Sequence, residues 1–323
     1  MNILITGGAG FIGTNFCYYL DSLNRTDDYY VIFDKLTYAG NKEYLEPLLK
    51  KDNFDFCFGD ICKYPELKKV IRDLKIDTVV HFAAESHVDN SIAHPDHFIE
   101  TNIKGTFRVL EEVKDYKLRL HHVSTDEVYG SLGKKGYFYE KTPYDPKSPY
   151  SASKASSDHL VRAYGHTYGI KYTISNCSNN YGPYQHREKL IPLTINRILN
   201  NKPIPVYGKG DNVRDWLYVE DHCSAIWKIL TEGKLGETYN IGGNCEKNNL
   251  EIVNTLCAEV AICRNESPNK YKSLITFVED RKGHDFRYAI NCDKLKGALK
   301  WAPRTEFKDG IKQTVEWYMR GLK

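Results

Sequence analysis

Residues 6–13 read Thr-Gly-Gly-Ala-Gly-Phe-Ile-Gly, and they decide the expected fold because they join a short apolar run to a segment of helical period. Gly7, Gly10 and Gly13 have the spacing G-x-x-G-x-x-G, which lets a backbone turn tightly and approach a pyrophosphate at the start of a helix. Asp34 closes the next apolar run about 20 residues further on, where a carboxylate can accept hydrogen bonds from ribose hydroxyls and repel a 2′-phosphate. These features predict a Rossmann-type, doubly wound α/β sheet that binds NAD rather than NADP.

Short runs of β-branched and aromatic residues alternate with longer helical segments, which is typical of βαβ units in a parallel sheet. The expected strands are residues 3–6, 30–34, 54–58, 78–82, 118–124 and 172–177, and the clearest expected helices are 100–115, 151–167 and 307–319. A single core stops growing at about 250 to 300 residues, so the 323 residues predict two lobes around one site. We expect residues 1–180 to form the NAD-binding domain, which also receives parts of 211–245, and residues 181–323 to form mainly a smaller α/β substrate lobe.

The composition is that of a globular protein, with 41% hydrophobic and 27% charged residues and a net charge of +3. Basic and acidic residues are interspersed without a run of five like charges, which argues against a nucleic-acid partner. No stretch approaches the roughly 18 apolar residues of a membrane span, and the chain opens directly into a strand rather than a signal peptide. Nine cysteines without a C-x-x-C pair predict a reduced, cytoplasmic protein with no metal site.

Tyr150 and Lys154 lie one helical turn apart, so their side chains share one face of a helix that begins after Pro149. A nearby cation favours the phenolate, which can take a hydroxyl proton while the same carbon gives up a hydride. Thr125 directly follows the fifth expected strand, residues 118–124. Together with the glycine-rich turn, these residues predict NAD-linked oxidation of an alcohol.

With these residues in place, the chain resembles the extended short-chain dehydrogenase/reductases along nearly its full length, and most closely their nucleoside-diphosphate-sugar 4,6-dehydratases, among them the dTDP-glucose 4,6-dehydratases. The segments that carry the resemblance are TGGAGFIG from Thr6, FDKLTYAGN from Phe33, FAAESHVD from Phe82, STDEVYG from Ser124, YSASK from Tyr150, NCSNNYGPYQ from Asn176, EKLIP from Glu188, VRDWLYVEDHCSAI from Val213, YNIGG from Tyr239 and DRKGHDFRYAI from Asp280. The resemblance implies a lyase that holds NAD, acts on a nucleoside-diphosphate hexose, with dTDP-glucose as the expected substrate, and forms a homodimer through two helices of each subunit, including the helix of Tyr150.

The adjacent carboxyl groups of Asp126 and Glu127 need a chemical reason, because oxidation and epimerisation require only Thr125, Tyr150 and Lys154. The resemblance implies that Tyr150 takes the C4 hydroxyl proton as hydride passes to NAD, Glu127 removes the C5 proton, and Asp126 protonates the departing C6 hydroxyl. The hydride then returns to C6. Two neighbouring carboxyls suit this chemistry because mutual repulsion raises the pKa of one, so that an acid and a base coexist near neutral pH.

The remaining expected site residues fall into two sets. The cofactor-binding residues are Gly7, Gly10, Phe11, Ile12, Gly13, Asp34, Lys35, Thr37, Ala39, Gly40, Asp60, Ile61, Phe82, Ala83, Ala84, Thr101, Tyr150, Lys154 and Asn180. The resemblance implies that the sugar nucleotide is bound by Ser86, His87, Asn179, Glu188, Lys189, Leu190, Pro205, Tyr207, Arg214, Asn249, Arg281, His284 and Tyr288. In the second set the two arginines supply charge for the diphosphate, to which the guanidinium fork is suited. We expect His81, His121 and His122 to be structural.

Four positions depart from the usual pattern of the bacterial members: Asn90, Arg187, Phe286 and Asn291. They leave open a UDP-sugar substrate, such as UDP-glucose or UDP-N-acetylglucosamine, with or without epimerisation at C5. A UDP-sugar 4-epimerase or decarboxylase is a rival on the same fold, but an epimerase expels no water and would have no use for the carboxyl pair. A non-catalytic NAD-binding or sugar-nucleotide-sensing module is a further alternative, and the complete Thr, Tyr and Lys set argues against it.

Overall fold

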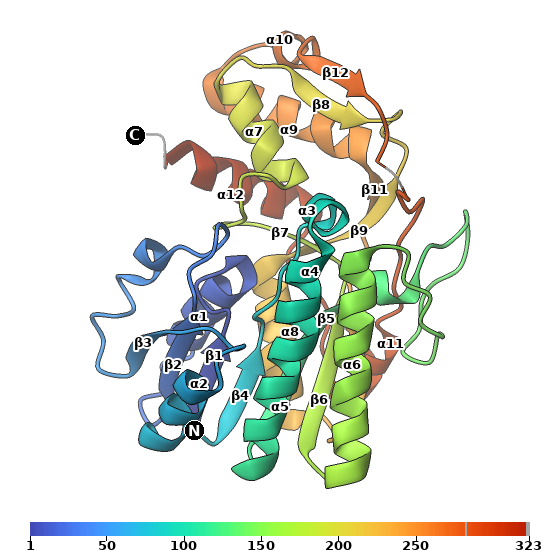
Figure 1. Ribbon diagram of the computed structural model, residues 1–323. Helices are drawn as coiled ribbons and strands as arrows, with labels where there is room; N and C mark the ends of the chain where they lie inside the picture. The colour runs from blue at the N-terminus through green and yellow to red at the C-terminus, as the bar shows by residue number, and fades with distance from the viewer. Residues whose placement is uncertain (282, 321–323) are drawn as a thin grey trace.

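The largest feature of the structure, a computed structural model that describes residues 1–281 and 283–320, is a seven-stranded sheet in the order β10-β6-β5-β4-β1-β2-β3 (Figure 1). Every neighbouring pair in this sheet is parallel. The described strands are β1 Asn2–Thr6, β2 Tyr29–Asp34, β3 Phe54–Phe58, β4 Thr78–His81, β5 Arg119–Thr125, β6 Lys171–Cys177, β7 Asn179–Tyr181, β8 Ile204–Tyr207, β9 Val213–Tyr218, β10 Thr238–Ile241, β11 Glu246–Asn248 and β12 Ile275–Val278. The strand order reverses beside β1, which confirms the predicted doubly wound fold.

Helices connect these strands and cover the sheet. The α-helices are α1 Phe11–Ser22, α2 Tyr64–Asp73, α3 Val88–Ala93, α4 Pro95–Phe98, α5 Thr106–Asp115, α6 Pro149–Tyr168, α7 Leu190–Leu199, α8 Val219–Glu232, α9 Asn249–Arg264, α10 Pro268–Lys272, α11 Asp293–Leu299 and α12 Phe307–Arg320. Two short 3₁₀ turns, η1 Lys42–Leu45 and η3 Asp126–Tyr129, and one π-helical turn, η2 Ile99–Gly105, complete the set.

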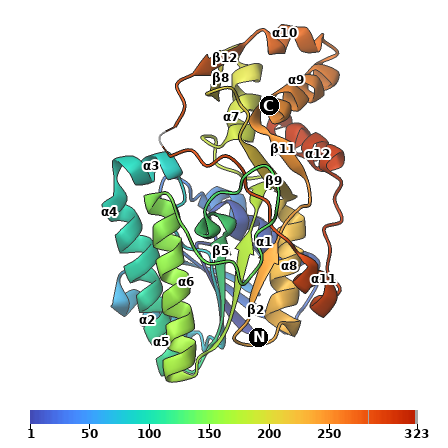
Figure 2. The ribbon, with the colours of Figure 1, turned by 90° about the vertical axis from the view of Figure 1, so that its right-hand side faces the viewer.

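The pleat of the sheet separates two apolar layers. Successive side chains of a strand point to opposite faces, so Ile3 and Ile5 pack on one face with α1, α8 and α11, whereas Leu4 packs on the other with α2, α5 and α6. Figures 1 and 2 show these helices on the two sides of the sheet. Because both faces are covered, every residue of β4 and all but the first residue of β5 are buried, the polar ones included.

A smaller lobe lies beyond the sheet, at the top of Figures 1 and 2. Its core is formed by side chains of α7, α9 and α12 packed on the two-stranded parallel sheet of β8 and β12. A three-stranded sheet, β11-β9-β7, runs between this lobe and the large sheet. The chain crosses between the two parts more than once, since α8 and β10 return to the large sheet after β9.

The expected helix over residues 100–115 is divided, because α5 begins only at Thr106 and the π-helical turn η2 precedes it. The wider turn brings Asn102 into the interior. Its side chain there accepts a hydrogen bond from the Glu85 amide at 2.8 Å and donates to the Glu85 carbonyl at 3.0 Å and to Ser153 Oγ at 2.8 Å. These long-range hydrogen bonds offset the poorer π-helical geometry, a combination that recurs at functional sites.

Within the part of the chain that the structure describes, no helix has the length and apolar character that crossing a bilayer would require. The nine cysteines are free thiols.

Candidate active site

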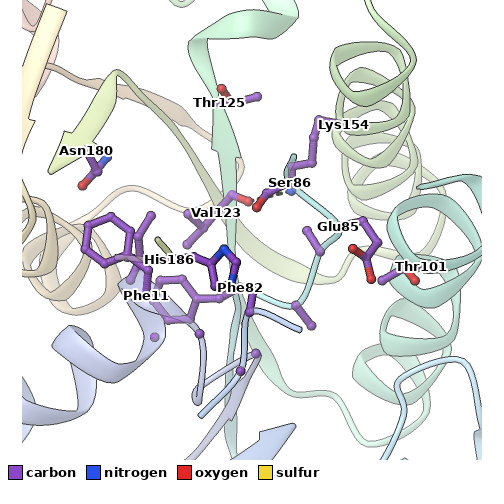
Figure 3. Close-up of a pocket in the computed structure, with 18 of the residues that line it drawn as sticks. Phe11, Phe82, Glu85, Ser86, Thr101, Val123, Thr125, Lys154, Asn180 and His186 are labelled. Atoms are coloured by element: carbon purple, nitrogen blue, oxygen red, sulfur yellow. Dashed lines mark hydrogen bonds between the residues drawn. The ribbon is translucent and has the colours of Figure 1, made fainter. Parts of the chain in front are cut away.

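A cavity of about 290 Å³ opens at the carboxyl ends of the central parallel strands, where open α/β sheets bind their ligands. Figure 3 shows Thr125 on β5 and Lys154 on α6 at one end of this cavity and Phe11 on α1 at the other. The cavity is lined by all five predicted catalytic residues, by every predicted cofactor residue except Asp60, and by three of the predicted substrate residues, Ser86, Asn179 and Lys189.

The glycine-rich turn forms the floor of the cavity. Gly7 has a φ of +71°, and a Cβ on it would lie 2.6 Å from the backbone nitrogen of Ala83. A Cβ on Gly13 would lie 2.4 Å from the Gly7 carbonyl oxygen. No side chain caps α1, whose N-cap is Gly10, so the amide groups of its first turn are available to an anion. The turn therefore fits the pyrophosphate of a dinucleotide.

Asp34 stands at the end of β2 with its carboxylate held by two backbone amides. Its Oδ2 accepts from Ala9 N at 3.0 Å and its Oδ1 from Leu36 N at 2.8 Å. A carboxylate has about four acceptor positions, so each oxygen can also accept a ribose hydroxyl. Burial raises the pKa of Asp34, which the two amides and Lys35 partly offset.

Lys35, which could in principle favour a 2′-phosphate, is engaged elsewhere. Its Nζ lies 3.8 Å from Oδ2 of Asp60 and donates to Thr101 Oγ1 at 3.3 Å. Asp60 therefore does not line the cavity itself, but its carboxylate balances the charge of Lys35, which does. This arrangement fits the adenosine end of NAD.

Helix α6 presents the predicted Tyr and Lys pair. The helix starts here because Ser148 and Ser151 form a reciprocal capping box and Pro149 occupies the first turn. Lys154 is buried, and its ammonium donates to the Val123 carbonyl at 2.9 Å. Burial lowers the pKa of Lys154, and the carboxylate of Asp158 opposes that shift.

Tyr150 is also buried, with its ring edge-on to Phe98 at 6.3 Å between centroids. Burial is the largest cause that raises the pKa of Tyr150 well above its usual value; the charge of Glu127 adds to the rise, and a hydrogen bond with Thr125 opposes it. The charge of Lys154 therefore does not by itself make the phenolate the favoured form. A positively charged group bound beside the ring would be needed as well.

The two neighbouring carboxyl groups have different surroundings. Asp126 is 2% exposed, its Oδ1 lies 3.4 Å from Thr125 Oγ1, and its Oδ2 has no hydrogen-bond partner among the described residues. Burial, followed by the charges of Glu127 and Asp215, raises the pKa of Asp126 well above its usual range. The surroundings of Asp126 therefore favour its protonated form.

Glu127 follows in the 3₁₀ turn η3, and its backbone amide is capped by the Thr125 hydroxyl at 3.3 Å. Burial raises the pKa of Glu127, but the charges of Lys189 and Arg214 lower it. Glu127 is thus better able than Asp126 to be ionised, and the pair can supply one acid and one base.

Most of the predicted substrate residues lie outside the cavity lining. They are His87, Glu188, Leu190, Pro205, Tyr207, Arg214, Asn249, Arg281, His284 and Tyr288. Several of them form a second cluster in the smaller lobe, where aromatic rings and cations alternate. The guanidinium of Arg214 lies 4.3 Å from the centroid of Tyr288, and that of Arg281 lies 5.4 Å from Tyr207, whose ring meets His284 edge-on at 6.3 Å.

The charges of this cluster act on the cavity, because Arg214 and Arg281 both lower the pKa of Glu127. Arg281 also makes a two-pronged ion pair with Asp89 of α3, with Nε–Oδ1 at 2.5 Å and a terminal nitrogen to Oδ2 at 2.8 Å. Lys189 donates to the Ser86 carbonyl at 3.0 Å, and His87 Nε2 lies 3.8 Å from Glu188.

The cavity also contains residues to which the sequence analysis assigned no role, among them Gln185 and His186. His186 meets the ring of Tyr38 edge-on at 5.5 Å, and the Gln185 side chain donates to the Asn180 carbonyl at 2.9 Å. The signal in the sequence was the segment NCSNNYGPYQ, which ends at Gln185 and is directly followed by His186. The three expected structural histidines are buried in β4 and β5; His81 and His121 bond to hydroxyl groups, and His122 lies 3.2 Å from Asp158.

Comparison with known proteins agrees with this site. The chain is 49% identical to dTDP-glucose 4,6-dehydratase 1 of Escherichia coli (strain K12), over 100% of this chain and 94% of that one. It shares 44% identity and a TM-score of 0.93 with the dTDP-glucose 4,6-dehydratase of Streptomyces venezuelae solved with NAD and TYD bound, over 99% of this chain and 97% of that one. For the Bacillus anthracis dTDP-glucose 4,6-dehydratase in complex with NAD, the identity is 46% and the TM-score 0.89, with the same coverage.

The family-level match covers residues 4–314, from the first strand to within the last described helix. It therefore includes the glycine-rich turn, the carboxyl pair and the Tyr-x-x-x-Lys helix as well as the cluster in the smaller lobe. The chain belongs to the GDP-mannose 4,6 dehydratase family.

Proposed function

We propose that this enzyme dehydrates dTDP-glucose to the corresponding 4-keto-6-deoxy sugar with NAD as its cofactor. The observation that carries the proposal is the carboxyl pair of Asp126 and Glu127 in the same cavity as Thr125, Tyr150 and Lys154. The relatives at 44% to 49% identity support the substrate, and the two solved with NAD bound support the cofactor.

The chain's residues fit NAD along the length of the cavity. The turn containing Gly7 and Gly13 would hold the pyrophosphate, Asp34 the adenosine ribose, and Lys154 the other ribose beside Tyr150. When bound, NAD supplies an acceptor for the hydride of the sugar C4 and later a donor for C6. Since the cofactor ends each turnover in its starting form, no second redox substrate is required.

The side chains supply the proton transfers. Tyr150 takes the proton of the C4 hydroxyl, and Thr125 donates a hydrogen bond to the C4 oxygen. The resulting ketone acidifies the C5 proton, which Glu127 removes as a general base. Asp126, which keeps its proton because it is buried, gives it to the C6 hydroxyl, and water leaves. A 4-epimerase returns the hydride to C4 without loss of water, so it would need no buried acid at this position.

The nucleotide end of the substrate would be held by the cluster in the smaller lobe. Arg214 and Arg281 would bind the diphosphate through charge-assisted hydrogen bonds, and Pro205 and Tyr207 would flank the base. The same resemblance assigns the remaining pocket to Asn249, His284 and Tyr288. Around the sugar it assigns Ser86, His87, Asn179, Glu188, Lys189 and Leu190.

We also propose that the enzyme is a cytoplasmic homodimer. Nine free cysteines suit a reducing compartment. The resemblance implies pairing through two helices of each subunit including the helix of Tyr150, and that helix, α6, packs beside η2. Light scattering coupled to size-exclusion chromatography would measure twice the mass of 37.2 kDa for a dimer; the monomer mass would contradict this proposal.

The deciding experiment is incubation of the purified protein with dTDP-glucose, without added cofactor, followed by mass spectrometry of the sugar nucleotide. Loss of one water with formation of a 4-keto-6-deoxy product is expected. UDP-glucose and UDP-N-acetylglucosamine are the comparison substrates, and a higher kcat/KM with either would move the assignment to a UDP-sugar. Recovery of only the C4-inverted sugar, or no turnover with any donor, would contradict dehydration.

A further inference from the structure

Asp158 is a buried carboxylate that the proposed mechanism does not use. It lies on α6, is 0% exposed, and is absent from the cavity lining. Its Oδ2 accepts hydrogen bonds from Tyr144 Oη at 2.7 Å and Ser124 Oγ at 3.0 Å, with Asn176 Nδ2 at 3.4 Å. Burying a charge this completely costs free energy of folding unless the charge is paired and hydrogen-bonded. The contacts of Asp158 therefore indicate its role.

Those contacts join α6 to the part of the sheet that carries the site. Ser124 belongs to β5 and immediately precedes Thr125, and Asn176 belongs to β6. The same Asn176 Nδ2 also donates to the Thr125 carbonyl at 3.0 Å. One carboxylate oxygen therefore holds the helix of Tyr150 and Lys154 against the strand end of Thr125.

Asp158 is also the carboxylate whose charge opposes the loss of the Lys154 proton. The two residues are four positions apart on one helix, so their side chains are neighbours. The Lys154 ammonium is buried with the Val123 carbonyl as its hydrogen-bond acceptor, and a carbonyl carries no full charge. A carboxylate one turn away is what allows an ammonium to stay protonated in a buried setting.

The other titratable or charged groups around this pair do not replace that charge. They are His81, His122, Tyr144, Tyr150, Arg162 and Cys177. Burial lowers the pKa of both histidines and raises that of Cys177 to about 12, so none of the three adds a counter-charge near neutral pH. Arg162, on the far side, donates to Tyr144 Oη at 2.7 Å. Asp158 Oδ1 lies 3.2 Å from Nε2 of His122, and the charges of Lys154 and Arg162 both lower the pKa of Asp158.

We propose that Asp158 is a positioning residue for the reaction: it keeps Lys154 protonated and holds α6 in register with Thr125, so that Tyr150 meets the C4 hydroxyl. It touches neither substrate nor cofactor. This inference rests on the proposed function, because it assigns Asp158 to the oxidation half of that reaction. It differs from a purely structural role in predicting a change in the pH dependence of catalysis.

The test is the pH profile of kcat for Asp158→Asn, which keeps the shape of the side chain and removes its charge. Without the carboxylate, Lys154 loses its proton at lower pH, so the alkaline limb of the profile should move toward acid by about one pH unit or more. KM for the sugar nucleotide should stay within about twofold, since neither residue reads the nucleotide. Asp115→Asn, which removes an exposed carboxylate at the end of α5, is the matched control and should leave the profile unchanged.

Three outcomes would overturn the proposal. They are a wild-type profile in Asp158→Asn, an equal loss of kcat at every pH, and an equal shift in the Asp115 control. If Asp158→Asn does not fold, Tyr144→Phe takes its place. It removes the hydroxyl that donates to Asp158 at 2.7 Å but leaves the charge of Asp158, so kcat should fall several-fold while the alkaline limb of the pH profile stays where it is. An unchanged kcat would refute the proposal. Wild-type protein that fails to dehydrate any donor would instead contradict the proposed function, so the two failures are distinguishable.

Discussion

Replacing Asp126 with asparagine tests the assignment of the acid most directly, because the change is isosteric and removes only the transferable proton. The wild-type carboxyl group is buried and keeps its proton, and the amide offers an N–H donor where the acid offers an O–H. Loss of a positioned general acid costs typically about 10²- to 10⁴-fold in rate. We therefore expect the kcat for dehydration of dTDP-glucose to fall by that factor in Asp126→Asn.

The same substitution should not destabilise the fold. The pKa of Asp126 is raised in the folded protein, so the folded state binds a proton that the unfolded chain releases above about pH 4. Wild-type stability therefore falls as pH rises from the unfolded pKa to the folded one, at up to about 1.4 kcal/mol per pH unit. The amide has no such dependence, so the variant should match wild type below about pH 4 and exceed it near neutral pH.

Two measurements test the role of Asp126 as the acid. Absorbance at the NADH band after addition of dTDP-glucose reports the first half-reaction, and mass spectrometry reports loss of water. Asp126→Asn should show reduced cofactor without dehydrated product, and thermal unfolding at several pH values should show equal stability at low pH and a more stable variant near neutral pH. Equal loss of both half-reactions would refute the role of Asp126 as the acid, and a variant less stable than wild type at neutral pH would refute the inference that it is buried in the protonated form.

Four further substitutions separate the parts of the site. Tyr150→Phe should lower kcat by about 10²- to 10⁴-fold and, unlike Asp126→Asn, should give no NADH absorbance with substrate. Arg281→Lys replaces the two-pronged guanidinium with a point charge, so KM for the sugar nucleotide should rise about tenfold or more. Asp89→Asn removes the ion-pair partner of Arg281 and should leave KM equal or lower. A KM that is unchanged in Arg281→Lys and raised in Asp89→Asn would contradict a role of Arg281 in binding the diphosphate. Gly13→Ala places a methyl group 2.4 Å from a backbone oxygen, which should cost about 1 to 3 kcal/mol and reduce the NAD that copurifies, measured by thermal unfolding and by cofactor release.

The features that could be predicted from the sequence are those that depend on local chemistry. The glycine spacing of residues 6–13, the aspartate at position 34 and the four-residue separation of Tyr150 and Lys154 each express a constraint that acts within one turn or one strand–helix junction. Such constraints are visible without tertiary information, and the doubly wound sheet that they predicted is confirmed. The expected helix over residues 100–115 is helical throughout, but residues 100–105 are π-helical rather than α-helical, because Asn102 makes hydrogen bonds with Glu85 and Ser153, which are far away in the chain.

The amino-acid sequence by itself determined the fold class, the residues of the dinucleotide turn and the presence of two adjacent carboxyls. Only the tertiary structure distinguishes the surroundings of those carboxyls, since burial and the charges of Glu127 and Asp215 raise the pKa of Asp126, whereas the charges of Lys189 and Arg214 lower that of Glu127. It likewise revealed that Asp158 faces β5 and β6. Burial and charge pairing depend on residues that are distant along the chain and become neighbours only when it folds. The periodicity of the sequence therefore does not predict which side chains are buried or paired.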